Sequence, residues 1–133
     1  FIIVGLGHSM IKNDIKVDTS KLIEKAKGDD LKESYEVILK KKDYRIGVGA
    51  RVDESQDNTF FIEVVVPISS GEGELNMDRM KRRVDLLEKF EEYDYRMKCE
   101  KDNSVVCEKN VSEEGIEKEY QRLTCFLDKL TEQ

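Results

Sequence analysis

The chain has 133 residues, of which 38% are hydrophobic and 39% are charged, and its 23 basic and 29 acidic side chains give a net charge of −6. This length suits one domain that builds its own core without disulfide or metal staples, and the mixed charges exclude a disordered tail. An acidic chain also lacks the concentrated basic field on which nucleic acid binding depends, so no nucleic acid partner is expected.

The cysteines and the N-terminus indicate the cellular setting. The three cysteines, Cys99, Cys107 and Cys125, are too few and too scattered for a disulfide framework or a zinc site, which predicts a reduced cytoplasmic chain. The apolar stretch at 1–6 is far too short to span a bilayer, so no membrane partner is expected. Because the chain does not begin with Met, residues 1–10 are predicted as a non-native or flexible terminus, with Met10 as the native start. The many Lys and Glu residues are typical of thermophiles.

The first predicted helix begins after Asp18 and ends at Gly28. Asp18 can accept a hydrogen bond from the first free N–H groups of the helix, and Gly28 is a common helix terminator. Between them, Leu22, Ile23 and Ala26 form an apolar stripe at helical spacing. The stripe predicts that one side of this helix packs on a core.

Three strands are predicted next, at 35–41, 44–52 and 60–68. The third is the most apolar run of the chain and is rich in β-branched and aromatic residues. A two-residue turn at 42–43 and a loop at 53–59 would join the strands into an antiparallel meander. The strand at 44–52 would then lie in the middle.

The expected register makes one face of this meander apolar in every row. The rows are Leu39 with Ile46 and Val66, Val37 with Val48 and Val64, and Tyr35 with Ala50 and Ile62. A slip of one residue would place Glu63 beside Val48 and break the apolar face, so the pattern specifies the register.

The opposite face is unusual because its middle strand presents two glycines. Its predicted members are Glu36, Ile38 and Lys40, then Arg45, Gly47, Gly49 and Arg51, then Phe61, Glu63 and Val65. Glycine inside a strand often marks a bulge or the close approach of another backbone or ligand. Two readings stay open: either the glycines permit sheet coiling and loops or a helix cover Ile38 and Val65, or the face docks a partner. The candidate partner-binding residues are Ile38, Gly47, Gly49, Phe61, Val65, Arg45 and Arg51.

A second helix and a second hairpin follow the meander. The helix has Asn76 as its expected cap, and its apolar stripe comprises Met77, Met80, Val84, Leu87 and Phe90. The hairpin is predicted at 95–101 and 105–110 around a three-residue loop. This loop would set Cys99 opposite Cys107, with Tyr95 and Met97 facing inwards. That geometry would allow a disulfide, although buried reduced thiols are expected in a cytoplasmic protein.

The last predicted helix begins at Ser112, which can cap it. Val111 and Ile116 stand at the spacing of a hydrophobic staple. The stripe comprises Tyr120, Leu123, Leu127 and Leu130, widened by Cys125 and Phe126. A stripe of this width predicts that the helix is the main cover of the apolar sheet face.

No motif for catalysis, a metal or a cofactor stands out. The Gly-Val-Gly run at 47–49 lies inside a strand rather than in a loop that opens a helix, so it does not predict a phosphate cradle. The only histidine, His8, lies in the doubtful terminus, which argues against a nucleophilic triad. The basic runs at 40–42 and 81–83 are predicted as a solvated turn and a solvated helix face. One alternative is a small-ligand sensor or enzyme that uses Arg45, Arg51, Glu36 and Glu63 as polar anchors.

The predicted order over residues 18–131 is helix, three-stranded meander, helix, hairpin, helix, which is an α+β domain formed from 1–133 as a single unit. This order resembles the type III secretion chaperone-like fold, shared with the YbjN-like bacterial proteins, in topology and without a shared motif. The roadblock/longin-like group differs because its middle helix follows two strands. The resemblance implies a non-enzymatic homodimer that binds an extended partner segment along its sheet. The implied dimer contact comprises Met80, Val84, Leu87, Met97 and Cys99.

We therefore expect a small cytoplasmic binding module, adaptor or chaperone-like, that captures a protein segment on its sheet. The alternatives are the sensor or enzyme named above and a structural subunit of a larger complex. If the glycines only form the floor of a docking surface, a bulky residue at Gly47 or Gly49 should leave the fold intact and abolish capture.

Overall fold

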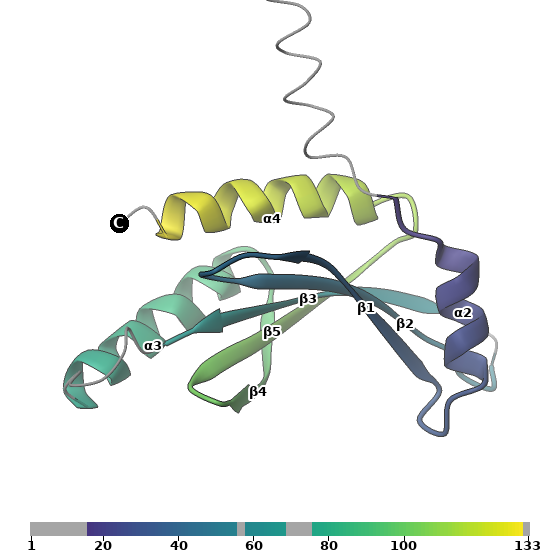
Figure 1. Ribbon diagram of the computed structural model, residues 1–133, viewed down its shortest axis with the longest axis horizontal. Coiled ribbons are helices and arrows are strands. Elements are labelled where there is room, and N and C mark those ends of the chain that lie inside the picture. The colour runs from purple at the N-terminus through teal and green to yellow at the C-terminus, as the bar shows by residue number, and fades with distance from the viewer. Residues whose placement is uncertain (1–15, 56–57, 69–75, 132–133) are drawn as a thin grey trace, which may run out of the picture.

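The computed structural model describes residues 16–55, 58–68 and 76–131 (Figure 1). The elements in chain order are α2 (Thr19–Lys27), β1 (Glu33–Lys40), β2 (Arg45–Arg51), β3 (Thr59–Pro67), α3 (Asn76–Glu92), β4 (Arg96–Lys101), β5 (Ser104–Val111) and α4 (Ile116–Thr131). The predicted α+β class and order of elements are confirmed for these residues. The predicted N-terminal segment 1–10 lies outside the described residues.

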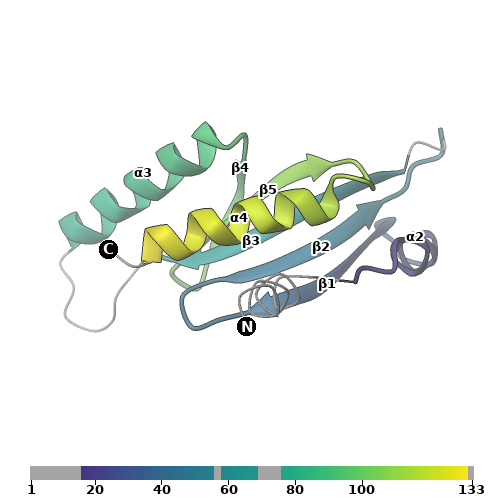
Figure 2. The same cartoon turned by 90° about the horizontal axis from the view of Figure 1, so that it is seen from above.

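The five strands form one antiparallel sheet in the order β1-β2-β3-β5-β4. α4 lies over one side of it, roughly along β2 and β3, whereas α2 sits at the end of β1 and β2 and α3 lies beside the edge strand β4 (Figures 1 and 2). We call the side under α4 the helix face and the other side the open face. No helix of the described segments is long and apolar enough to cross a membrane.

The core fills the space between the helix face and α4. On the helix face of the strands, the fully buried side chains are Ile46, Val48, Ala50, Ile62, Val64, Val105 and Cys107. Leu123 and Leu127 of α4 pack onto them, and Leu22 and Ala26 join the same cluster from α2. Removing this much apolar surface from water is the main stabilising contribution to the fold. The prediction that the last helix covers the apolar face is confirmed.

The ends of the helices follow local rules of capping. Asp18 Oδ1 accepts a hydrogen bond from the backbone N–H of Lys21 at 3.1 Å, and Gly28 ends α2, as predicted. At the other end of the chain, Gly115 N–H donates to Ser112 Oγ at 3.1 Å, which closes a turn, so α4 begins only at Ile116. Ser112 therefore stabilises the turn that precedes α4 and does not cap the first residue of the helix.

A bulge in β1 overturns half of the predicted first hairpin. Leu39 does lie opposite Ile46, but the register shifts between Val37 and Leu39. Val37 therefore pairs with Gly47, and Tyr35 pairs with Gly49. A β-bulge changes the face of every residue beyond it, so these two side chains lie on the open face instead of in the core.

The pairing of β2 with β3 differs from the prediction by two residues. Val48 lies opposite Ile62 rather than Val64, and Ala50 lies opposite Phe60. Because side chains alternate with a period of two, this shift keeps every residue on its predicted face. The predicted faces of these strands are therefore correct, and the predicted partners are wrong.

The second hairpin has a two-residue turn at 102–103, where φ is 52° and 61°, as in the turns that favour tight hairpins. A bulge after Met97 places Cys99 opposite Val106 instead of Cys107. Cys99 is exposed, Cys107 is buried, and both are free thiols. Burial raises the pKa of the Cys107 thiol to about 12. The predicted pairing of the two cysteines is wrong.

Only the C-terminal half of α3 packs on the core. Leu86 and Phe90 are buried, and the ring of Phe90 meets the ring of Phe126 edge-on with centroids 5.4 Å apart. The exposed apolar side chains of its N-terminal half are Met77, Met80 and Val84. The predicted continuous stripe therefore divides into a buried half, which includes the unforeseen Leu86, and an exposed half.

A buried carboxylate fixes α4 to the neighbouring strands. Glu119 accepts hydrogen bonds from the Tyr95 hydroxyl at 2.8 Å and from Lys109 Nζ at 3.0 Å, and Arg122 approaches it at 3.4 Å. Burial, together with the charge of Glu119, raises the pKa of Tyr95 well above its ordinary value. These partners satisfy a charge that would otherwise be costly to bury.

Candidate functional site

The open face has three zones, from one end of the strands to the other. At one end, charged side chains from all five strands form an ion-pair network. In the middle, aromatic rings cover the two glycines of β2. At the other end, the β1–β2 and β4–β5 turns border a hollow. Among the described helices, α4 covers the far side and α2 and α3 lie at the end and the edge of the sheet, so none of them covers this face (Figures 1 and 2).

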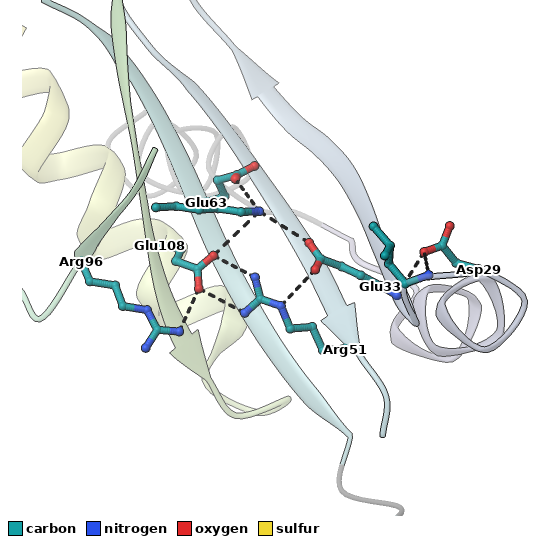
Figure 3. A network of polar contacts seen from close by, with 8 residues as sticks. Asp29, Glu33, Arg51, Glu63, Arg96 and Glu108 are labelled. Atoms are coloured by element: carbon teal, nitrogen blue, oxygen red, sulfur yellow. Dashed lines mark hydrogen bonds and ion pairs between the residues drawn. The ribbon is translucent and has the colours of Figure 1, made fainter. Parts of the chain in front are cut away.

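The ion-pair network comprises Glu33, Arg51, Glu63, Arg96, Lys98 and Glu108. Arg51 lies between two acids: its Nη2 is 2.8 Å from Glu108 Oε1, and its Nε is 3.2 Å from Glu33 Oε2 (Figure 3). Arg96 reaches the other oxygen of Glu108 at 2.9 Å. Hydrogen bonds from Arg51, supported by Arg96, lower the pKa of Glu108 to about 2 despite its burial.

The network forms a lid over Phe61. The guanidinium carbon of Arg51 lies 4.1 Å from the centroid of the Phe61 ring, and Lys98 Nζ lies 5.7 Å from it. Phe61 is consequently fully buried, although it points to the open face. Two predicted partner-binding residues, Phe61 and Arg51, are thus occupied by contacts within the chain.

The glycines of β2 make room for neighbouring aromatic rings. A Cβ atom on Gly49 would come within 3.0 Å of the Phe61 ring and of the Ser34 carbonyl oxygen. A Cβ atom on Gly47 would come within 3.0 Å of the Tyr35 ring. The rings lie directly on the glycines, a packing that compensates for the missing side chains. The cover is therefore neither a loop nor a helix, and the glycines do not form a bare floor for a partner.

The exposed apolar groups of this face are not the predicted ones. Tyr35 is 38% exposed and Val37 is 43% exposed, and both were expected in the core. Ile38, predicted on the open face, packs against the core instead because of the bulge. Val65 is on the open face as predicted and is partly buried. Partial burial and the carboxylate of Glu63 raise the pKa of the Tyr35 hydroxyl to about 12.

The hollow has a volume of about 400 Å³ and is strongly basic. We call it the basic hollow. Its basic side chains are Lys40, Lys42, Arg45 and Lys101, and its apolar floor comprises Val65, Pro67 and Val106. Asp102 is the acidic side chain that lines it among the described residues. Lys41 also borders it, but its Nζ pairs with Asp128 at 3.4 Å. The sequence predicts only a solvated turn at 40–42. It does not predict the hollow, because the second turn that borders it, at 102–103, lies about sixty residues further along the chain.

The residues implied for a dimer contact do not form a single patch. Met80 and Val84 are exposed on α3, whereas Leu87 is partly buried against the core. Met97 is close to α3, with its sulfur 3.8 Å from Arg83 Nη2. Cys99 pairs in register with Val106, which belongs to the open face.

The four anchors proposed for a sensor or enzyme are also separated. Arg51 and Glu63 are committed to the ion-pair network, and Arg45 lies at the basic hollow. Glu36 pairs in register with Val48, which lies on the other face. Within residues 16–55, 58–68 and 76–131, no group of His, Cys, Asp and Glu could hold a metal ion.

No family model, curated protein or solved structure matches the chain.

Proposed function

We propose that the protein is a non-enzymatic binding module, adaptor or chaperone-like, that captures an extended, acidic segment of a partner protein on its open face. One observation carries the proposal: the exposed Tyr35 and Val37 adjoin a basic hollow on a face that no described helix covers. Apolar contact area supplies affinity, and the basic groups select for acidic segments.

The segment is expected to lie across the strands rather than to extend the sheet at an edge. Both edge strands, β1 and β4, contain a bulge, at Ile38 and at Lys98. The edge strand β4 also carries three basic residues, Arg96, Lys98 and Lys101. Bulges and charges of this kind prevent the addition of a further strand, as they do in other sheet proteins.

Charge supports an acidic partner. The chain as a whole carries a net charge of −6, yet one end of the open face gathers four basic side chains around an apolar floor. A local positive field attracts an acidic segment to this face, whereas the acidic remainder of the surface repels it.

Selection of a random dodecapeptide library on the purified chain tests this function. We expect enriched peptides to combine acidic with apolar residues, and Val37→Glu to weaken their binding at least tenfold, because it puts a like charge beside the segment. Leu31→Glu is the matched control, since Leu31 is 85% exposed outside the open face. Binding is measured by fluorescence anisotropy, and circular dichroism verifies the folding of both variants.

Two results would contradict this function. One is the absence of enrichment, or enrichment of basic peptides. The other is an equal loss of affinity in Val37→Glu and Leu31→Glu, which would show that the segment does not occupy the open face.

We also propose that the protein forms a homodimer through α3, centred on the exposed side chain of Val84. Val84 lies at the middle of this helix, with Met80 one turn before it, and both are exposed. Before Val84 the helix carries one acidic residue, Asp78, and four basic ones, Arg79, Lys81, Arg82 and Arg83. After Val84 it carries one basic residue, Lys89, and four acidic ones, Asp85, Glu88, Glu91 and Glu92. A two-fold axis at Val84 would pack the helices antiparallel, with the basic half of each beside the acidic half of the other.

Light scattering coupled to size-exclusion chromatography measures this association. We expect a mass of about twice 15.5 kDa for the natural chain and 15.5 kDa for Val84→Glu, which places two like charges at the symmetry axis. Glu117→Lys on α4, an exposed charge change away from α3, should leave the mass of the dimer unchanged. A natural chain that stays monomeric at tens of micromolar would refute the dimer.

A further inference from the structure

The two ends of the open face differ in whether their basic side chains form ion pairs. At the network end, Arg51, Arg96 and Lys98 each pair with a carboxylate of the chain. At the hollow end, no ion pair within the described parts of the chain involves any of the four basic side chains of the basic hollow, and Asp102 is the acid at its wall. Four cations beside the one carboxylate of Asp102 leave this end with a net positive charge, which favours the binding of an anion.

The basic hollow brings together groups that suit one compact, highly charged anion. Arg45 supplies a planar fork of donors, which suits bidentate binding of phosphate, and three lysines supply mobile ammonium groups. A phosphate monoester carries a charge of about −1.5 to −2 and three acceptor oxygens, against one charge for a carboxylate. One phosphate can therefore neutralise several of these cations at once, where acidic residues would have to converge from several positions of a segment.

We infer that the basic hollow holds a phosphorylated side chain of the captured segment. This inference rests on the proposed function, because it assigns the hollow to the same segment that crosses the open face. The hollow is continuous with that face: Arg45 belongs to β2 beside Gly47, and Val65 lies opposite Arg45 on β3. Its volume of about 400 Å³ exceeds what a free phosphate fills and leaves room for the side chain that carries it.

The experiment compares three versions of one peptide library. Heptapeptides with randomised flanks carry phosphoserine, serine or glutamate at the central position, and their binding to the full chain is measured on arrays and then by fluorescence anisotropy at physiological salt. We expect phosphoserine peptides to bind at least tenfold more tightly than their serine and glutamate counterparts. Free O-phosphoserine and inorganic phosphate serve as competitors, and we expect each to compete only at concentrations at least a hundredfold higher than those of the peptides.

Paired lysine variants locate the site. Lys42→Ala with Lys101→Ala should abolish the preference for phosphoserine, because both ammonium groups line the hollow. Lys21→Ala with Lys118→Ala removes the same charge from exposed positions of α2 and α4 and should preserve the preference. Both double variants change only exposed side chains, so they are expected to fold.

The outcomes separate this inference from the proposed function. Equal binding of the three peptide versions, or a preference that survives the loss of Lys42 and Lys101, overturns the phosphate site and leaves segment capture standing. Competition by free O-phosphoserine as strong as that by the peptides overturns the inference in favour of a small-molecule site. The absence of binding by any version overturns both.

Discussion

Replacing Gly49 with alanine is expected to lower the free energy of unfolding by about 3 kcal/mol or more, which corresponds to a fall in melting temperature of roughly 10 °C. The added methyl group would come within 3.0 Å of the fully buried ring of Phe61 and of the backbone oxygen of Ser34. Neither neighbour can move away easily, because the lid formed by Arg51 holds the ring and the oxygen belongs to β1. Urea denaturation followed by circular dichroism measures the change.

Gly28→Ala is the matched control for this variant. Gly28 has a φ of −86°, and its added Cβ would meet only the carbonyl oxygens of Glu24 and Lys25, each at an ordinary 3.8 Å. This change is expected to leave stability the same or to raise it by about 0.4–1 kcal/mol, since alanine restricts the unfolded chain. Equal effects at Gly28 and Gly49 would show that the close approach of Phe61 and Ser34 does not constrain the sheet.

Gly47 should be more tolerant than Gly49. The three atoms nearest to its added Cβ all belong to the side chain of Tyr35, which is 38% exposed and can turn towards solvent. The expected cost is about 1 kcal/mol, and combining the change with Tyr35→Ala should remove the clash. This order corrects the expectation that a bulky residue at either glycine spares the fold, because the glycines accommodate aromatic rings of the chain itself.

Replacing Glu108 with glutamine is expected to lower the free energy of unfolding by about 2–3 kcal/mol at neutral pH. The side chain is 4% exposed and pairs with Arg51 and Arg96, which lower its pKa from 4.5 to about 2. Because the folded pKa is the lower one, the carboxylate stabilises the fold fully above pH 4.5, and this contribution is lost as the pH falls from 4.5 towards 2. The difference between the natural chain and Glu108→Gln should therefore shrink over that window.

Urea denaturation at steps from neutral pH down to about pH 3 measures this difference. Glu36→Gln is the control, since it removes the same charge from an exposed position of β1 that has no ion pair within the described chain. It should change stability by less than about 0.5 kcal/mol at every pH. A cost for Glu108→Gln that does not vary between pH 7 and pH 3 would contradict the assigned pKa and its cause.

The open face shows why the residues of a site can be predicted wrongly even when the helices and strands are predicted correctly. The strands at 44–52 and 60–68 were placed on the right faces, because alternation with a period of two is a local property of the sequence. The bulge at Ile38 was not foreseen, since an eight-residue strand with apolar residues on both faces fits two registers equally well. Because of this one bulge, Ile38 packs against the core, and Tyr35 and Val37 take its predicted place on the open face. These two side chains form the exposed apolar part of the candidate site.

The sequence by itself determined the α+β class, the order of the elements, the cap at Asp18 and the helix that covers the apolar face, because capping and periodicity act between residues close in the chain. The tertiary structure alone decided which charges are paired and which are left over. Arg51 pairs with Glu108, 57 positions away, whereas Lys42 and Lys101 line the same hollow from two different turns. Contacts between distant segments depend on the pairing of strands, and no local pattern specifies that pairing completely.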